Sequence, residues 1–522
     1  MLRRRSRACP KARKTKRSAI RRLLLTLPLL LGACGDPPGD ALRMGLASAP
    51  VNLDPRFATD AASTRVNRLL YQRLVDFDPR SLPLPSLADW EQIGPTRYRF
   101  ILGDEGRSFS DGSRLDAEDV AATYRFILAP ANASPHRTTL EMIERIEVLD
   151  SERLEFHLKR PDPLFPAYLV IGILPAELQS AGHPFASQPV GSGGCRLLEW
   201  PEEGRLLLER RRDGQRLELV RVSDPTVRSL KLLRGEIDLM QNDLPPELLA
   251  YLEGRPEVRV ERRRGSNFSY LGFNLQDPVT GRLEIRRAIA QAIDREAIIR
   301  YVLAGGAAPA QALLPPSHWA GHPDLEGFRF DPEAARRHLA AAGYGPDNPL
   351  RLVYKTSADP FRIRLATIIQ SQLADVGIQV DLRSYDWGTF YGDVKAGRFQ
   401  MYSLAWVGIQ TPDIFRYAFH SQSLPPKGAN RGRYRDPEAD RLIEQASSLS
   451  SLEAQAPIYR ELQARLLEQL PYVPLWYEDH VLVSRTGVED YELAADGNYD
   501  GLLRVWRHPQ AAATAAVVAN HR

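Results

Sequence analysis

The sequence predicts an α/β protein with more than one lobe. Segments with the alternation typical of strands lie at 42–49, 97–102, 153–158 and 350–356. Helical hydrophobic periods are interspersed with them, at 117–128, 226–234, 284–303, 332–342, 361–376 and 437–469. This mixture extends over about 470 residues, which is more than a typical single domain contains. The chain has 522 residues, of which 43% are hydrophobic, so it can bury a large core.

Four of these helices begin with a recognisable cap. Asp-Pro pairs at 224–225, 331–332 and 436–437 each precede a helical period. The aspartate accepts hydrogen bonds from the free backbone N–H groups of the first turn. Proline suits the first helical position because it has no N–H that would need a partner. Asp116 is expected to cap the helix over 117–128 in the same way, without proline. These signals concern structure alone.

The N-terminus has the pattern of an export signal. Residues 1–22 contain eleven Lys and Arg and no acidic residue, and an apolar run follows at 23–31. As a helix, the run and the next two residues would be roughly 16 Å long, against about 30 Å for a bilayer core. We therefore predict a signal peptide over 1–33 and a tether over 34–41. Without the signal the net charge changes from +4 to −7, which argues against nucleic-acid binding.

The letters "LGAC" at 31–34 resemble the lipobox of bacterial lipoproteins. The resemblance implies that a diacylglycerol is attached to Cys34 and anchors the protein to a membrane. The alternative is an unmodified cysteine after an ordinary secretory signal. With Cys34 lipidated, Cys195 is the one free cysteine of the mature chain, so no internal disulfide is expected.

The sequence contains no recognisable catalytic motif. It has no G-x-S-x-G, no H-E-x-x-H and no Walker-type loop. "GSGG" at 191–194 predicts a tight crossing of the chain, and Glu478 with Asp479 is expected on a solvated face. His318 and His322 lie in a segment rich in proline and glycine, which disfavours a metal pair. We therefore expect neither an enzyme nor a bound cofactor or metal.

Several segments in chain order carry a more specific resemblance. They are "LDPRFATDAAS" (53–63), "FSDGSRLDAEDV" (109–120), "PVGSGGCRL" (189–197), "LRGEID" (233–238), "LGFNL" (271–275), "IRRAIAQAIDREAII" (285–299), "DPEAARRHLAAAGY" (331–344) and "NRGRYRDPEADRLIEQA" (430–446). Together they are similar to the family 5 extracellular solute-binding proteins, the peptide, dipeptide and nickel binders of ABC importers. The likeness covers nearly all of the mature chain.

The resemblance implies a fold of the type II periplasmic-binding-protein kind, with two lobes, a hinge and three domains. Domain I would comprise 42–70, 190–267 and 479–509. Domain II, over 71–189, would be inserted in it, domain III would span 268–478, and 510–522 would be a flexible tail. The implied function is to capture a small solute, an oligopeptide by default, in a cleft between the lobes. The protein would deliver it to ABC permease subunits from the periplasmic or cell-surface side of a bacterial membrane.

The family likeness also nominates residues of the cleft. Trp387 and Trp406 have the spacing of two cleft tryptophans of the family, and the backbone of Ala405 and Val407 would pair with an extended ligand. The alternative is that both tryptophans belong to the core. Asn267, Phe268 and Asn274 are weaker candidates, and Asn274 could instead satisfy backbone groups.

One position departs from the peptide binders. They carry an aspartate three residues after the second tryptophan, where this chain has Ile409. Asp413 could take its role towards a ligand ammonium or could cap a helix starting at Ile414, and Arg416 could favour an anion. Modified or blocked peptides, sugars and opines remain alternatives as ligands. A solute sensor or adaptor on the same scaffold and, less favoured, a lipid-anchored hydrolase remain alternatives as functions.

Overall fold

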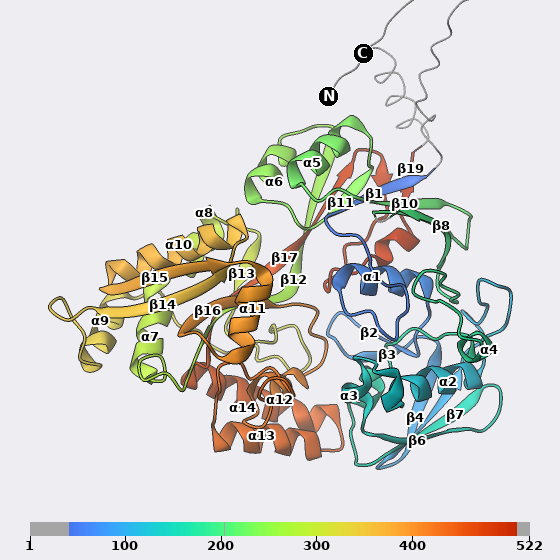
Figure 1. Ribbon diagram of the computed structural model, residues 1–522, viewed down its shortest axis with the longest axis horizontal. Helices are drawn as coiled ribbons and strands as arrows, with labels where there is room; N and C mark the ends of the chain where they lie inside the picture. The colour runs from blue at the N-terminus through green and yellow to red at the C-terminus, as the bar shows by residue number, and fades with distance from the viewer. Residues whose placement is uncertain (1–40, 203, 509–522) are drawn as a thin grey trace, which may run out of the picture. The chain divides into compact units, whose positions relative to one another are not determined.

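One large mixed sheet connects the two lobes of the molecule (Figure 1). The structure is a computed structural model that describes residues 41–202 and 204–508. Within these residues the sheet has eleven strands, ten of them in the order β15-β14-β16-β12-β17-β11-β1-β10-β9-β8, while β13 pairs with β17. Their bounds are β1 (Leu42–Leu46), β8 (Cys195–Glu202), β9 (Arg205–Arg210), β10 (Arg216–Arg221), β11 (Leu239–Gln241), β12 (Val258–Phe273), β13 (Ala307–Pro309), β14 (Leu350–Ser357), β15 (Ile378–Tyr385), β16 (Met401–Trp406) and β17 (Tyr472–Arg485).

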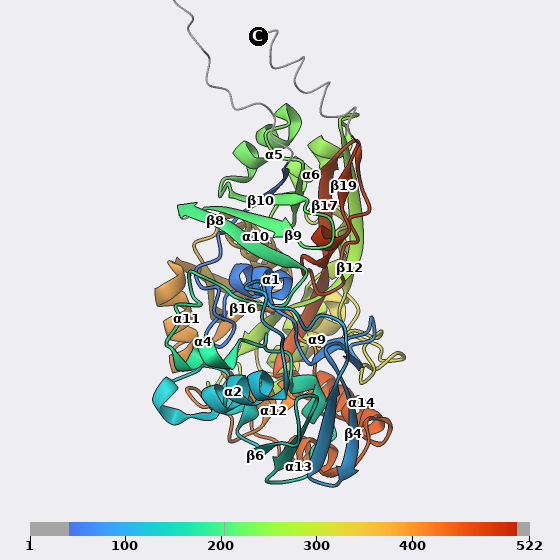
Figure 2. The same cartoon turned by 90° about the vertical axis from the view of Figure 1, so that its right-hand side faces the viewer.

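The long antiparallel strands β12 and β17 run side by side and belong to both halves of this sheet (Figure 2). At one end β17 pairs with β11, which continues to β1 and β10. At the other end β12 pairs with β16. The register of the pair shifts between Arg263 and Asn267, and such an irregularity is a natural point for a ladder to bend.

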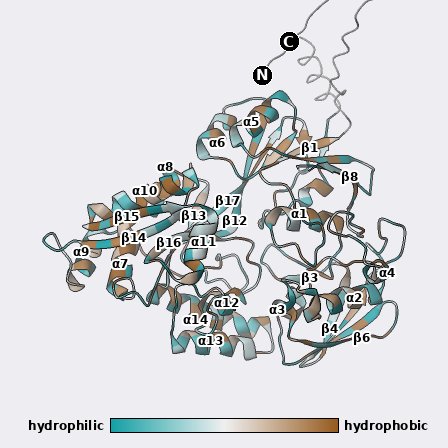
Figure 3. Ribbon diagram, in the orientation of Figure 1, coloured by the Kyte–Doolittle hydropathy of each residue, from teal (hydrophilic) through white to brown (hydrophobic). Residues whose placement is uncertain are grey.

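A second sheet, separate from the first, has the order β4-β5-β7-β6. Its strands are β4 (Ala88–Gly94), β5 (Arg97–Leu102), β6 (Ile143–Val148) and β7 (Arg153–Leu158). Two small pairs complete the strands of the described residues: β2 (Val75–Phe77) with β3 (Pro83–Pro85), and β18 (Val488–Glu489) with β19 (Trp506–Arg507). Burial alternates along β5, as expected for a strand with one covered face. Figure 3 shows that hydrophobic and hydrophilic residues are mixed along the ribbons of this sheet.

The helices confirm the predicted starts. They are α1 (Ala61–Leu70), α2 (Ala117–Leu128), α3 (Arg137–Leu140), α4 (Ala176–Ser180), α5 (Pro225–Arg234), α6 (Pro246–Glu253), α7 (Leu283–Ala292), α8 (Arg295–Tyr301), α9 (Pro332–Ala341), α10 (Pro360–Asp375), α11 (Trp387–Ala396), α12 (Ile414–Phe419), α13 (Pro437–Ser448) and α14 (Leu452–Gln469), with 3₁₀ turns at Pro130–Asn132, Phe165–Tyr168 and Asp500–Leu503. Asp116, Asp224, Asp331 and Asp436 all accept from the first turn of their helices.

Two predicted helices are each divided in the structure. The period over 284–303 forms α7 and α8, and the one over 437–469 forms α13 and α14. In both places a polar cap starts a new helix: Asp294 accepts from Ala297 N–H, and Ser451 accepts from Ala454 N–H. The hydrophobic period continues through the break because both helices of each pair cover the same core.

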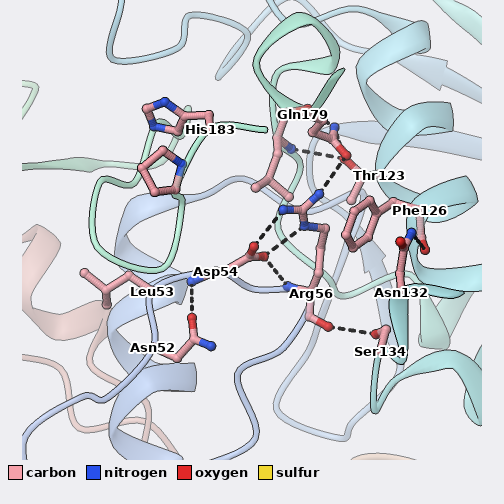
Figure 4. A network of polar contacts seen from close by, with 12 residues as sticks. Asn52, Leu53, Asp54, Arg56, Thr123, Phe126, Asn132, Ser134, Gln179 and His183 are labelled. Atoms are coloured by element: carbon pink, nitrogen blue, oxygen red, sulfur yellow. Dashed lines mark hydrogen bonds and ion pairs between the residues drawn. The ribbon is translucent and has the colours of Figure 1, made fainter. Parts of the chain in front are cut away.

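An ion pair within the first lobe ties the segment after β1 to α2 and α4 (Figure 4). Arg56 and Asp54 are almost fully buried and form two side-chain hydrogen bonds, of 3.0 and 2.7 Å. The guanidinium lies 3.8 Å from the ring centroid of Phe126 in α2 and donates to Gln179 Oε1 in α4. The acid and the base of the "LDPRF" segment can therefore be buried because each is paired with the other and the arginine also contacts α2 and α4.

The glycine-rich segment at 191–194 makes the predicted close crossing. A Cβ on Gly191 or Gly193 would lie 2.1 or 2.4 Å from a backbone oxygen at the end of α1. Cys195, directly after it, is buried as a free thiol. In the described part of the chain no helix is both long and apolar enough to cross a membrane. The predicted signal peptide, Cys34 and the tail over 510–522 lie outside the described residues.

Candidate functional site

A cavity of about 240 Å³ lies in the second lobe, beside strands β14 and β16 of the main sheet. Its walls come from β12, β14, β16, β17, α10 and α11. Apolar side chains dominate, and the lining residues include Leu365, Ile369, Trp387, Phe390, Leu404, Ala405, Val407, Leu475 and Trp476. Pockets that enclose a whole small ligand measure about 300–1,000 Å³. The size therefore suits one apolar group of a larger solute.

Three of the predicted site residues meet at this cavity. Trp387 is the first residue of α11, whose N-terminus is capped by Asp386, and its side chain is 59% exposed. Ala405 and Val407 belong to β16 and the residue after it. Trp387 is thus not a core residue. Trp406 is only partly exposed, packs against the main hydrophobic cluster and does not line this cavity, so its contact with a ligand stays a prediction.

Strand β16 has an unpaired backbone edge beside the cavity. On one side it pairs with β12 along Met401–Trp406. On the other side its pairing with β14 ends at Tyr402. In the described residues no strand therefore covers the β14 side of 403–406. An exposed strand edge of this kind can receive an added extended chain through main-chain hydrogen bonds.

The two tryptophans are joined by a stack of aromatic rings and a cation. The ring of Trp387 stacks on that of Tyr391, with centroids 5.3 Å apart and planes at 6°. The guanidinium carbon of Arg431 lies 5.3 Å from the centroid of Tyr391 and 4.7 Å from that of Trp406. Tyr417 completes the surroundings of Trp406 in an edge-to-face contact.

Arg431 is buried, and its side chain has an unusual set of partners. It is 7% exposed and donates to the hydroxyls of Tyr270 and Tyr391, each at 3.1 Å. No carboxylate of the described residues lies within ion-pair distance of it. Sequence reasoning missed this residue, because an arginine in a loop carries no local sign that it is buried among aromatic rings.

A charged group next to the cavity corrects a sequence-based expectation. Glu478, expected on a solvated face, accepts from Arg362 at 3.1 Å and from the Ser269 hydroxyl at 2.8 Å. Burial would raise the pKa of Glu478, but these two partners hold it below its ordinary value. Its neighbour Asp479 pairs with Arg264 at 3.1 Å. Arg362, which lines the cavity, is therefore paired with a carboxylate behind the lining.

Asp413 lies directly before α12, but its side chain makes no capping bond. Burial raises its pKa, against the opposing effect of Arg416 and Arg160. Asp162, in the loop after β7, lies close enough to Asp413 to interact with it, and burial raises the pKa of Asp162 to about 6. Arg416 itself donates to the Ser447 hydroxyl. A role of Asp413 or Arg416 towards a ligand stays a prediction.

The remaining candidates lie near or beyond the cavity. Asn267 pairs with Glu478 in the ladder of β12 and β17, and its buried Oδ1 has no hydrogen-bond partner. Phe268 is 1% exposed and stacks on Tyr270. The side chain of Asn274 is used by a turn: Nδ2 donates to Gly397 O, and Oδ1 accepts from Gln276 N–H. Ligand contact by these three residues also stays a prediction.

Comparison with known proteins agrees with this architecture. The model of "Bacterial extracellular solute-binding proteins, family 5 Middle" matches residues 83–424. Among curated relatives, "Di/tripeptide-binding protein 2" of Pseudomonas aeruginosa is 27% identical, over 92% of this chain and 97% of its own. "Heme-binding protein A" of Haemophilus influenzae is 26% identical, over 82% of this chain and 85% of its own.

Solved structures show the same fold. One is NikZ from Campylobacter jejuni in complex with Ni(L-His), with a TM-score of 0.77 at 24% identity. The match covers 90% of this chain and 99% of that one. The family model alone covers more than half of the chain, from β3 to the loop after α12. The chain therefore belongs to the bacterial extracellular solute-binding proteins of family 5.

Proposed function

We propose that this protein is the substrate-binding component of an ABC importer and that its solute is peptide-like. The observation that carries the proposal is the unpaired edge of β16 over 403–406, beside an apolar cavity lined by Trp387 and Val407. An extended ligand would pair with the edge while one of its side chains entered the cavity. The names of several relatives, which refer to dipeptides and tripeptides, support the same ligand class.

The capture step would use a hinge between two lobes. The irregular register of β12 between Arg263 and Asn267 supports a bend at the boundary predicted between domains I and III. A ligand that contacts both lobes only in the closed form shifts the equilibrium towards closure, by its differential affinity for the two forms. Permease subunits would then distinguish loaded from empty protein.

The protein would act outside the cytoplasm, attached through a lipid on Cys34. The basic segment, the short apolar run and the "LGAC" sequence support this part of the proposal. We expect Cys34→Ala to release the protein from the membrane fraction of the producing bacterium. Persistent tight membrane association of the variant would contradict lipidation.

Ligand binding is tested with the protein lacking residues 1–34. Solute that co-purifies is released and identified by mass spectrometry, and peptides of that class are then titrated calorimetrically. We expect Trp387→Ala to weaken binding by more than about 1 kcal/mol, while the control Trp506→Ala, which lies in β19, leaves the affinity unchanged. N-methylation of the peptide backbone should also weaken binding, because a methylated amide cannot pair with the strand edge.

Two results would overturn the proposal. One is the absence of any bound solute together with no affinity for peptides. The other is turnover of the bound solute, which would favour the hydrolase alternative. Binding without uptake in cells that express the importer would instead favour a sensor.

A further inference from the structure

The side-chain hydrogen bonds and ring contacts of Arg431 all involve aromatic residues of the second lobe. Three other buried or partly buried arginines without a carboxylate partner, Arg228, Arg286 and Arg295, donate to backbone carbonyls of loops and strands. Such bonds hold the main chain together. Arg431 donates to two tyrosine hydroxyls and lies against two rings instead. Its contacts therefore orient side chains of the site.

The loop that carries Arg431 is fixed from both sides. Asn430 donates to the carbonyls of His420 and Tyr434 and accepts from Tyr434 N–H. Gly432 is pressed against β12, since a Cβ there would lie 2.6 Å from Phe273 O, and its carbonyl accepts from Leu275 N–H. A rigid backbone on each side of residue 431 gives the guanidinium a defined position.

We infer that Arg431 is a positioning residue that holds Trp406 and, through Tyr391, Trp387 in their solute-binding orientation. This inference rests on the proposed function. Trp406 contacts the guanidinium directly, and Trp387 stacks on the ring whose hydroxyl the guanidinium binds. Trp387 and Trp406 then belong to one aromatic unit that is ordered before the solute arrives, which lowers the entropic cost of binding.

Arginine suits this task better than other residues of its size. Its planar group donates in several fixed directions and stacks on aromatic faces, whereas lysine presents a compact charge that cannot do both. Burying a cation without a carboxylate is costly, and methionine would fill a similar volume without that cost. The fixed hydrogen bonds and ring contacts that only a guanidinium can make compensate for the cost of burying this cation.

The test is a double-mutant cycle between Arg431→Met and Trp387→Ala, measured by titration with the tripeptide Ala-Phe-Ala. No direct contact joins these two side chains in the structure, so independent roles predict additive losses. We expect Arg431→Met to weaken binding about tenfold, and Trp387→Ala to cost much less in the Arg431→Met background than in the wild type. Equal losses in both backgrounds would overturn the inference. The control cycle uses Arg433→Lys, because Arg433 donates to a backbone carbonyl of Lys395, and should be additive.

A second measurement needs no ligand. The near-ultraviolet circular dichroism of the wild type minus that of Trp387→Phe isolates the signal of the stacked indole. We expect this difference to shrink strongly when both proteins carry Arg431→Met, to shrink partly with Tyr391→Phe, and to persist with Arg433→Lys. An unchanged difference spectrum in the Arg431→Met background would refute the positioning role. If wild-type protein fails to bind the tripeptide, the proposed peptide ligand is wrong, and the dichroism alone decides the role of Arg431.

Discussion

Arg56 and Arg431 are buried to nearly the same extent but are stabilised in different ways. Arg56, in the first lobe, shares two hydrogen bonds with the buried carboxylate of Asp54. Arg431, in the second lobe, has only tyrosine hydroxyls and aromatic rings around its side chain. A paired charge fixes a fold, because each partner becomes costly once the other is removed. An unpaired one can be removed at smaller cost to stability, so its presence points to function.

The largest effect is expected where this pairing is broken. Asp54→Asn leaves the Arg56 cation buried without its carboxylate, and we expect it to lower the free energy of unfolding by about 3–5 kcal/mol. Thermal or denaturant unfolding measures this loss. The matched control is Asp60→Asn, at the N-cap of α1, where asparagine caps equally well and the effect should be close to zero. A loss at Asp54 no larger than at Asp60 would show that the pair does not stabilise the lobe.

Removing both charges of the pair separates the cost of the unpaired cation from other effects of Asp54→Asn. Asp54→Asn combined with Arg56→Met should recover about 2 kcal/mol or more relative to Asp54→Asn alone, since no unpaired charge remains buried. Denaturant titration of the two variants under identical conditions gives the difference. Equal stability of the single and double variants would mean that the unpaired Arg56 cation is not what makes Asp54→Asn costly.

Local sequence signals predicted the helices and strands of both lobes well. They did not predict the clusters around Arg56 and Arg431. Strand β5 and helix α2 have the predicted bounds because alternation and the Asp116 cap act over a few residues. The contact of Arg431 with Tyr270 joins residues 161 positions apart, and Arg362 and Glu478 are 116 apart. Such contacts arise from strand order and loop position, which periodicity does not specify. Trp387 and Val407 were predicted from the family likeness, and the structure places them at the cavity.

The converse case is a partly buried carboxyl without a cation at bonding distance, and Asp162 provides it. Burial, with the nearby Asp413, raises its pKa to about 6, against about 3.9 in an unfolded chain. The folded protein therefore retains a proton that the unfolded chain releases, and this contribution to stability is lost as the pH rises through about 6.

Asp162→Asn should accordingly increase stability by about 2 kcal/mol near pH 7.5 and change it little near pH 4. The asparagine can still accept from Leu164 N–H, as Asp162 does. The exposed Asp104 gives the control, because Asp104→Asn should have no effect at either pH. A stabilisation that is independent of pH would point to a cause other than the charge of Asp162.

The smallest effect on stability is expected at Arg431 itself. Arg431→Met leaves no carboxylate unpaired, and the hydroxyls of Tyr270 and Tyr391 lose a donor but remain able to donate elsewhere. Lost hydrogen bonds of about 1 kcal/mol each oppose the gain from no longer burying a cation, so we expect a net change within about 1 kcal/mol. Unfolding in denaturant measures it, and the slope of the transition should stay unchanged. A loss of unfolding free energy comparable to that of Asp54→Asn would mean that both arginines stabilise the fold to a similar extent. The contrast between the lobes would then disappear.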